Sequence, residues 1–251
     1  MTNVDLILLI LIFFATSFIG VVTGSNSLIA VPAMFQFGIP AKTAVATNMF
    51  ALVFMSIGAT IPFLRTRTID VRRILPLMLI TIAASAAGAA LVGLITDQSL
   101  KLIVSIAMIT VAVFILVKRD AGIEKRERVS SRSLALTFIL TFVLGVYGGL
   151  FSGGYVTVLT TVLVAFFGMT FREAVASTKL INVASSSIAT VVFMWQGLVD
   201  YRLGAILGIT MFGAAYVGAH YATKLDDVWI KRIFLATVFL LAIKTIFDFL
   251  R

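Results

Sequence analysis

Eight long apolar segments constrain this chain more than any other feature of its sequence. A helix that spans a bilayer needs about 20 consecutive, mostly apolar residues. Soluble domains are about 45–50% apolar and about 25% charged, whereas this chain is 61% hydrophobic and 12% charged. The sequence therefore predicts an all-α polytopic membrane protein whose solvent is the lipid bilayer. The predicted spans are residues 4–23, 43–64, 74–95, 99–117, 134–152, 173–195, 203–223 and 229–250.

Two shorter apolar segments, 26–37 and 156–167, each follow a stretch that is rich in glycine. At about 1.5 Å per residue, neither segment comfortably crosses a hydrocarbon core about 30 Å thick. Both segments are therefore predicted to be half-helices. The expected fold has about eight full spans and two half-helices.

The second set of apolar segments repeats the first at an offset of 130 residues, without a gap. The matches include charged residues and glycines, which chance similarity between Ala-, Val- and Leu-rich segments would not place in one register. We interpret the chain as two homologous membrane halves, residues 1–117 and 133–251, joined by a linker at 118–132. The matched pairs include Gly24 and Gly154, Gly38 and Gly168, Asp70 and Asp200, Arg72 and Arg202, Gly88 and Gly218, Asp97 and Asp227, and Lys101 and Lys231.

The net charge of +9 would suggest a nucleic-acid partner in a soluble protein. Here the basic residues gather in polar loops: the linker 118–132 holds six Lys or Arg residues and the loop 65–73 holds four more. Loops rich in Lys and Arg are typical of the cytoplasmic side of a membrane. We therefore predict a multi-pass protein with a cytoplasmic linker and without a nucleic-acid partner.

The charge bias of the loops reverses between the two halves. The loop 195–203, which matches 65–73, contains only one basic residue, whereas 224–232 contains three and matches the lightly charged loop 96–101. This reversal favours an inverted repeat, in which each half crosses the membrane an odd number of times. A parallel repeat is the alternative, in which segment 26–37 only extends the first span and each half has four crossings.

The two glycine-rich breaks form the core of the predicted substrate site. Non-helical backbone is tolerated at membrane depth only where it lines a cavity or is buried in protein, and paired breaks in two halves indicate a transport site. The free N–H groups and positive dipole end of a half-helix attract an anion. Close helix packing through small residues is the alternative. The predicted residues at the breaks are Gly24, Ser25, Asn26, Ser27, Ser152, Gly153, Gly154, Tyr155 and Thr157.

Further polar residues lie just inside the span that follows each half-helix. Their hydroxyls and amides can replace the hydration shell of an anion, and interhelical hydrogen bonding is their alternative role. Lys179 lies about two turns inside a predicted span, where a charge is costly and usually functional. We interpret it as the cation that pairs with the anion, with snorkelling toward the interface as the alternative. The other predicted residues of this group are Thr47, Asn48, Ser177, Thr178 and Asn182.

His220, the only histidine, lies near the end of a predicted span. It is a candidate for proton coupling, and packing at the membrane interface is its alternative role. The chain contains no cysteine, and no carboxylate lies deep in a predicted span. Thiolate sites and His-cluster metal sites are thereby excluded, and neither a metal nor a cofactor is predicted.

In their order and spacing, these motifs resemble the TauE/SafE family of sulfite exporters, also called the sulfonate-uptake permease group. The likeness covers nearly the whole chain and is carried by the duplicated layout, by Gly24–Pro32, by Ala44–Asn48 and by the glycine-rich block that ends at Gly154. The resemblance implies a bacterial inner-membrane carrier of small sulfur-containing or organic anions, such as sulfite, sulfonates and thiosulfate.

We expect a secondary transporter that moves such an anion by alternating access of its two halves, and not an enzyme. An anion channel is the first alternative, although the sequence lacks a ring of pore-lining charge. The second is an intramembrane serine protease that uses Ser152 and His220. The segment Gly149–Gly153 is one residue too long for the Gly-x-Ser-Gly pattern of such enzymes. A homodimer is left open.

Overall fold

The computed structural model describes residues 2–24, 26–117, 129–226, 228–229 and 232. Within these residues the regular structure is entirely helical, as predicted. The helices are α1 (Asn3–Thr23), α2 (Asn26–Gln36), α3 (Ala41–Arg65), α4 (Val71–Leu94), α5 (Asp97–Val117), α6 (Ser131–Leu150), α7 (Tyr155–Phe166), α8 (Phe171–Trp195) and α9 (Tyr201–Ala222).

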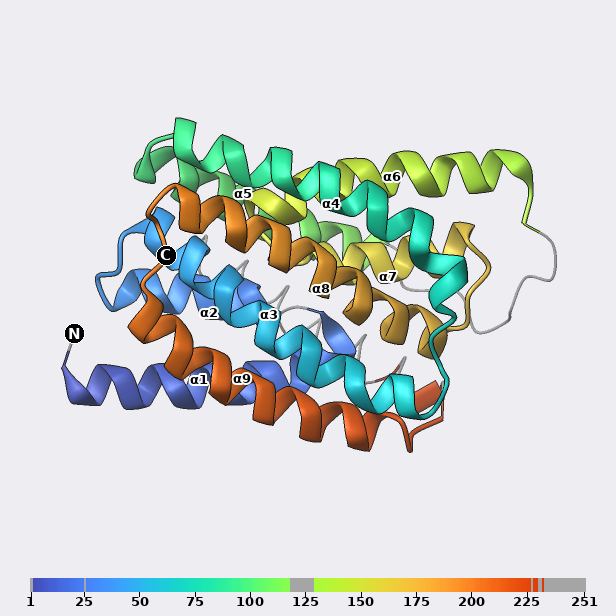
Figure 1. Cartoon of the computed structure of the whole chain (residues 1–251), viewed down its shortest axis with the longest axis horizontal. Helices are drawn as coiled ribbons and strands as arrows, with labels where there is room; N and C mark the ends of the chain where they lie inside the picture. The colour runs from blue at the N-terminus through green and yellow to red at the C-terminus, as the bar shows by residue number, and fades with distance from the viewer. Residues whose placement is uncertain (1, 25, 118–128, 227, 230–231, 233–251) are drawn as a thin grey trace.

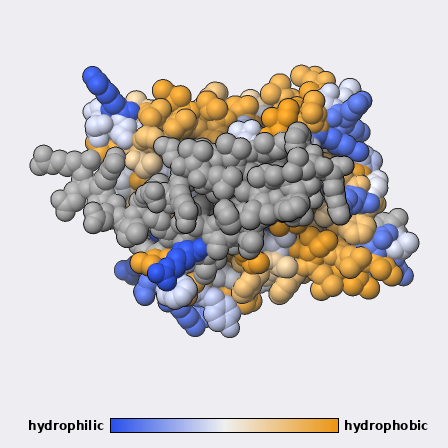
Figure 2. Space-filling model, turned by 180° about the vertical axis from the view of Figure 1, so that it is seen from behind, coloured by the Kyte–Doolittle hydropathy of each residue, from blue (hydrophilic) through white to orange (hydrophobic). Residues whose placement is uncertain are grey.

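Six helices in the described part of the chain, namely α1, α3, α4, α6, α8 and α9, are long and apolar enough to cross a membrane. They run along the long axis of the molecule (Figure 1). Hydrophobic surface lies along the upper and lower edges of the view in Figure 2, and hydrophilic residues gather toward the two ends of the molecule. The chain is a multi-pass membrane protein.

The predicted count of eight full spans is not confirmed. Helix α5 covers the predicted span 99–117 but is not among the six. The predicted span 229–250 lies almost entirely outside the described residues, as does most of the linker 118–132.

Both glycine-rich stretches break the helical path. Helix α1 ends where Gly24 adopts a left-handed backbone, with a φ angle of 71°, and donates its N–H to the Gly20 carbonyl at 2.8 Å. Helix α6 ends at Leu150, and α7 begins after Gly154, whose φ angle is 77°. The short helices that follow, α2 and α7, have 11 and 12 residues. At about 1.5 Å per residue, neither crosses a bilayer core about 30 Å thick.

The helices before and after the linker pack in matching pairs. Helix α4 packs against α6 and α8, and α9 packs against α1 and α3. In both sets a glycine lies against a backbone carbonyl of the neighbouring helix: Gly88 faces the Val146 carbonyl, and Gly218 faces the Phe18 carbonyl. The helices α3 and α8 each have 25 residues, and their first residues are Ala41 and Phe171.

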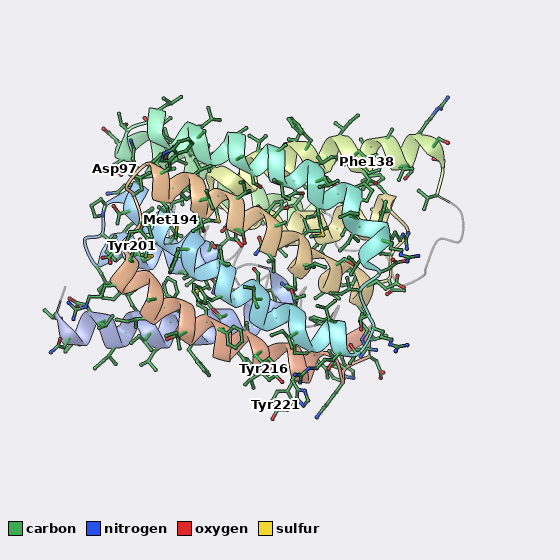
Figure 3. The ribbon with its side chains drawn as sticks, in the orientation of Figure 1. Asp97, Phe138, Met194, Tyr201, Tyr216 and Tyr221 are labelled. Carbon is green, nitrogen blue, oxygen red and sulfur yellow. The ribbon has the colours of Figure 1, made fainter. Side chains whose placement is uncertain are left out.

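The loops gather at two opposite ends of the molecule. At one end, the Lys42 N–H donates to Asp97 at 2.7 Å, and Figure 3 shows Asp97 and Tyr201 on this side. At the other end, Arg73 donates to the Phe167 carbonyl and Arg172 to the Thr223 carbonyl. The basic loop 65–73 and the start of α6 lie at this second end (Figure 1).

Arg67 has an unusual backbone in the loop that joins α3 to α4. Its φ angle is 54°, in the left-handed region, and Gly197, 130 residues later, has a φ angle of 68°. The hydrogen bonds of the two loops also match: the Thr68 N–H donates to the Phe63 carbonyl, and the Leu198 N–H donates to the Phe193 carbonyl. This arrangement is the Schellman ending of a helix, whose left-handed position favours glycine.

We therefore expect Arg67→Gly to stabilise the protein by about 0.5–1 kcal/mol. A left-handed residue other than glycine costs about 1–2 kcal/mol, and the greater freedom of glycine in the unfolded chain offsets part of the gain. The measurement is thermal unfolding of the purified protein in detergent. Arg67→Ala is the control, since it removes the charge and keeps the Cβ atom. An equal gain in both variants would attribute the effect to charge.

Candidate functional site

A cavity lies where the two breaks meet, enclosed by α1, α2, α3, α7, α8 and the turn before α7. It measures about 20 Å³, which is room for about one ordered water molecule. Six of the residues predicted from the sequence line it: Gly24, Asn26, Ser27, Ser152, Lys179 and Asn182.

Gly24 lets the two breaks approach each other. A Cβ atom on Gly24 would lie 2.8 Å from the Val156 side chain and 2.9 Å from the Thr157 N–H nitrogen. The Thr157 hydroxyl donates to the Thr23 carbonyl at 2.6 Å, at the end of α1. Both the left-handed backbone and the lack of space restrict this position to glycine.

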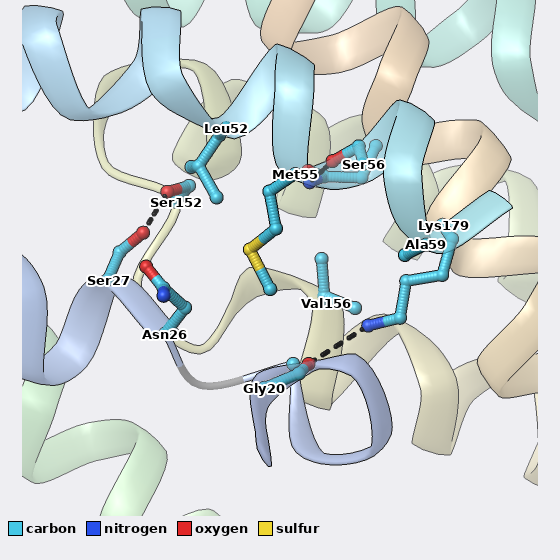
Figure 4. A pocket seen from close by; sticks show the side chains of 12 residues that line it. Gly20, Asn26, Ser27, Leu52, Met55, Ser56, Ala59, Ser152, Val156 and Lys179 are labelled. Atoms are coloured by element: carbon cyan, nitrogen blue, oxygen red, sulfur yellow. Dashed lines mark hydrogen bonds between the residues drawn. The ribbon is translucent and has the colours of Figure 1, made fainter. Parts of the chain in front are cut away.

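A chain of hydroxyl and amide groups connects the two breaks directly. The hydroxyls of Ser27 and Ser152 are 2.7 Å apart, and the Asn48 side chain donates to Ser27 at 2.9 Å. All three side chains are buried. Figure 4 shows Ser27 and Ser152 on one side of the cavity and Lys179 on another. A hydroxyl can donate or accept, so these hydrogen-bonded side chains can turn N–H or O–H groups toward a bound anion.

Lys179 brings a positive charge into the cavity from α8. Its side chain is 4% exposed, and its ammonium donates to the Gly20 carbonyl at 3.1 Å (Figure 4). No carboxylate of the described residues forms an ion pair with it. An ammonium has three N–H donors, of which one is used by Gly20. The geometry leaves the others available to a ligand in the cavity.

Two buried side-chain amides of the lining each have an oxygen without a hydrogen-bond partner in the described structure. Asn26 donates to the hydroxyls of Thr16 and Ser17, both at 2.9 Å, and Asn182 donates to Ser56 at 2.6 Å. The side-chain oxygens of Asn26 and Asn182 have no hydrogen-bond partner in the described structure. Since hydroxyls can donate as well as accept, either amide can flip and present its N–H₂ group to a ligand.

The structure places several other predicted residues away from the cavity. Thr47 accepts the Asp200 N–H at 3.0 Å, near one end of the molecule. The Thr178 hydroxyl donates to the Val175 carbonyl of its own helix at 2.9 Å, and Ser177 is buried without a partner in the described structure. None of these three residues lines the cavity.

The remaining predicted residues support the second break or lie elsewhere. Gly153 accepts a hydrogen bond from Tyr147, and Gly154 starts α7, whereas Tyr155 is buried among residues of α4, α6 and α8. Ser25 lies outside the described residues. His220 is exposed near the end of α9, with its ring against Tyr221. The hydroxyl of Ser152 is bonded to Ser27 and not to His220.

One wall of the cavity was missed by the sequence analysis. It comes from the second half of α3, where Leu52, Met55, Ser56 and Ala59 face the cavity. Figure 4 shows the Met55 side chain extending between Asn26 and Lys179. These residues belong to a long apolar helix, and the Ser56 hydroxyl is the only feature of their sequence that could have indicated a polar site. The cavity therefore has a polar side, which carries Lys179, and a largely apolar side.

In the part of the chain that the structure describes, no cluster of His, Cys, Asp or Glu could hold a metal ion. The cavity lining contains no acidic residue. Lys179 is the only ionisable residue of that lining.

Comparisons with known proteins match the chain to membrane transporters. The family model described as "Sulfite exporter TauE/SafE" matches residues 8–245. A probable membrane transporter protein, ORF9, of Sinorhizobium sp. is 29% identical over 94% of this chain and 90% of its own. The probable membrane transporter YfcA of Escherichia coli K12 is 26% identical over 97% and 91%, and one from Haemophilus influenzae is 24% identical over 98% and 96%. No solved structure matches the chain.

Proposed function

Because the chain belongs to the sulfite exporter TauE/SafE family of membrane transporters, we propose that it is a secondary transporter for a small sulfur-containing or organic anion. Sulfite, sulfonates and thiosulfate represent this class. The proposed membrane is the bacterial inner membrane. The proposed partners are the anion and the bilayer, with a homodimer as a further prediction.

The observation that carries the proposal is the Lys179 ammonium in a cavity between two helix breaks. A buried charge in a membrane protein is costly and needs a functional reason. The Asn26, Ser27 and Asn182 side chains surround the same cavity with groups that can donate hydrogen bonds. Transporters bind anionic groups at the N-terminal ends of half-helices. Here the starts of two half-helices and the Lys179 ammonium lie at the same cavity.

Alternating access is the proposed mechanism, with the two halves of a duplicated, inverted fold moving relative to each other. The matching pairs of helices support the duplication, and the opposite directions of α3 and α8 in Figure 1 support its inversion. The cavity has room for about one water molecule, so a polyatomic anion requires its walls to separate. The hydrogen bonds from Ser152 to Ser27 and from Lys179 to Gly20 join the halves and would break in that motion.

We propose that the end of the molecule with the loop 65–73 faces the cytoplasm. Arg65, Arg67, Arg72 and Arg73 gather there, together with Arg172 at the start of α8. Positive residues favour the cytoplasmic side of a membrane. Helix α6, which follows the linker 118–132 in the sequence, begins at this end (Figure 1), so we propose that the linker is cytoplasmic as well.

A panel of anions tests the proposed function. The purified protein is heated in the potassium salts of sulfite, thiosulfate, sulfoacetate, sulfate, acetate and chloride, and with taurine, at constant ionic strength and K⁺ concentration. A ligand at 100 times its Kd stabilises the folded state by about 2.7 kcal/mol. We expect a saturable rise in melting temperature with one sulfur-containing anion. Equal shifts with all salts, or no shift with any, would contradict the proposal.

A further inference from the structure

Beside the cavity lies a second group of buried polar side chains, which the proposed function does not use. It consists of the hydroxyls of Thr81 and Ser85 on α4, of Tyr155 on α7 and of Ser185 on α8, together with the Gly145 carbonyl on α6. We call this group the hydroxyl cluster. We propose that the hydroxyl cluster binds a sodium ion.

The oxygens of the hydroxyl cluster converge from four helices. The Ser85 and Ser185 hydroxyls are 2.7 Å apart, and Ser85 donates to the Gly145 carbonyl at 3.0 Å. The Tyr155 hydroxyl lies beside those of Thr81 and Ser185 but has the geometry of a hydrogen bond to neither. All four hydroxyl residues are at most 1% exposed.

Two of these hydroxyls are unsatisfied in the described structure, those of Thr81 and Tyr155. A buried polar group without a partner costs about 1–3 kcal/mol. The fold does not require hydroxyls here, because the positions that correspond to Thr81, Ser85 and Ser185 at the offset of 130 residues are all apolar. They are Met211, Ala215 and Met55, respectively, and all three are buried. The extra polarity in one set of helices thus calls for a ligand.

The chemistry of the hydroxyl cluster selects the class of ligand. Its ligating atoms are all neutral oxygens, which suit a hard cation. No acidic residue belongs to the cluster, so it lacks the carboxylates that divalent sites use. Membrane carriers bind Na⁺ with such neutral oxygens next to broken helices. The four hydroxyls and one carbonyl carry no charge, which suits a monovalent cation, and their number suits an ion of the size of Na⁺.

The position of the hydroxyl cluster connects it to the cavity. Tyr155 is the first residue of α7, and its neighbour Val156 lines the cavity. Ser185 lies one turn beyond Asn182, another lining residue, on α8. A bound cation would therefore hold the start of α7 and this turn of α8 in place beside the cavity. This coupling role rests on the proposed function, whereas cation binding itself does not.

Melting temperatures in graded NaCl, KCl and choline chloride, at constant ionic strength and without a sulfur anion, test the sodium site. We expect a saturable stabilisation by Na⁺ alone. Thr81→Val and Ser185→Ala should each raise the Na⁺ concentration for half-maximal stabilisation at least about 10-fold, the usual scale for one lost ligand-supporting group. The matched control is Thr137→Val on α6, since this equally buried hydroxyl already donates to the Ser133 carbonyl of its own helix.

Identical curves in the three salts for the wild-type protein would overturn the sodium site and indicate that water fills the hydroxyl cluster. An unchanged Na⁺ response in Thr81→Val and Ser185→Ala would overturn its location. The anion panel uses potassium salts only, so either proposal can fail while the other stands. Coupling predicts in addition that Na⁺ lowers the apparent Kd of the anion that the panel identifies, by reciprocal linkage. An unchanged Kd would overturn coupling alone.

Discussion

Replacement of Gly149 by alanine is expected to destabilise the protein by about 3 kcal/mol or more, or to prevent folding. A Cβ atom at this position would lie 2.1 Å from the Ser85 carbonyl oxygen and 2.6 Å from the Ser85 Cα atom. Both are backbone atoms of α4, so no side-chain rotation relieves the clash. Overpacking typically costs about 1–3 kcal/mol, and more when backbones must separate. The contact joins α4 to α6, next to the second break.

The measurement is thermal unfolding in detergent, together with the yield of monodisperse protein. Gly213→Ala on α9 is the matched control, since nothing lies within 4 Å of the Cβ atom that it would add. In a helix interior, alanine is favoured over glycine by about 0.8–1 kcal/mol, so the control should be neutral or more stable. Similar stability in the two variants would contradict the close packing of α4 on α6.

Lys179→Met is expected to weaken anion binding by about 10- to 100-fold while the protein stays folded. Hydrogen bonds to charged groups contribute about 1.5–3 kcal/mol, and each 1.4 kcal/mol is a factor of ten in affinity. Methionine is the residue at position 49, which is buried in α3 and corresponds to Lys179 at the offset of 130 residues. The substitution therefore removes the charge and introduces the side chain that is already buried at the corresponding position of α3.

The measurement is the concentration dependence of the melting temperature on the anion that the panel identifies. Lys42→Met is the control, because Lys42 also donates from its ammonium to a glycine carbonyl, that of Gly93 at 3.3 Å, but lies outside the cavity. We expect unchanged affinity in the control. A well-folded Lys179→Met protein that binds the anion as tightly as the wild type would remove Lys179 from the site.

The span positions could be predicted closely because a bilayer demands a minimum apolar length. The segment 43–64 became α3, at Ala41–Arg65, and 173–195 became α8, at Phe171–Trp195. Local chemistry also marked the starts of α4 and α9: the side chains of Asp70 and Asp200 cap them by accepting the N–H groups of Arg73 and Leu203. Six spans are supported, while the eighth predicted span lies almost entirely outside the described residues.

The breaks were predictable for a similar reason. Gly24 and Gly154 have φ angles of 71° and 77°, and such left-handed positions leave a glycine in the sequence as their signal. The inward position of Lys179 was also expected, since a charge in a span avoids lipid. Its carbonyl partner was not. The Gly20 carbonyl accepts both the Gly24 N–H and the Lys179 ammonium through its two lone pairs, and no residue type encodes a backbone oxygen.

The sequence by itself determined that this chain spans a membrane, where its helices begin, where two of them break and that a lysine is buried among them. These properties follow from hydrophobic length, capping and the cost of charge in lipid, which act within a short segment. Only the tertiary structure decided that Met55 and Ser56 face the cavity, and that Tyr155 turns to the hydroxyl cluster instead. The physical reason is that most faces of these helices are apolar enough for lipid, so their orientation is set by packing against their neighbours.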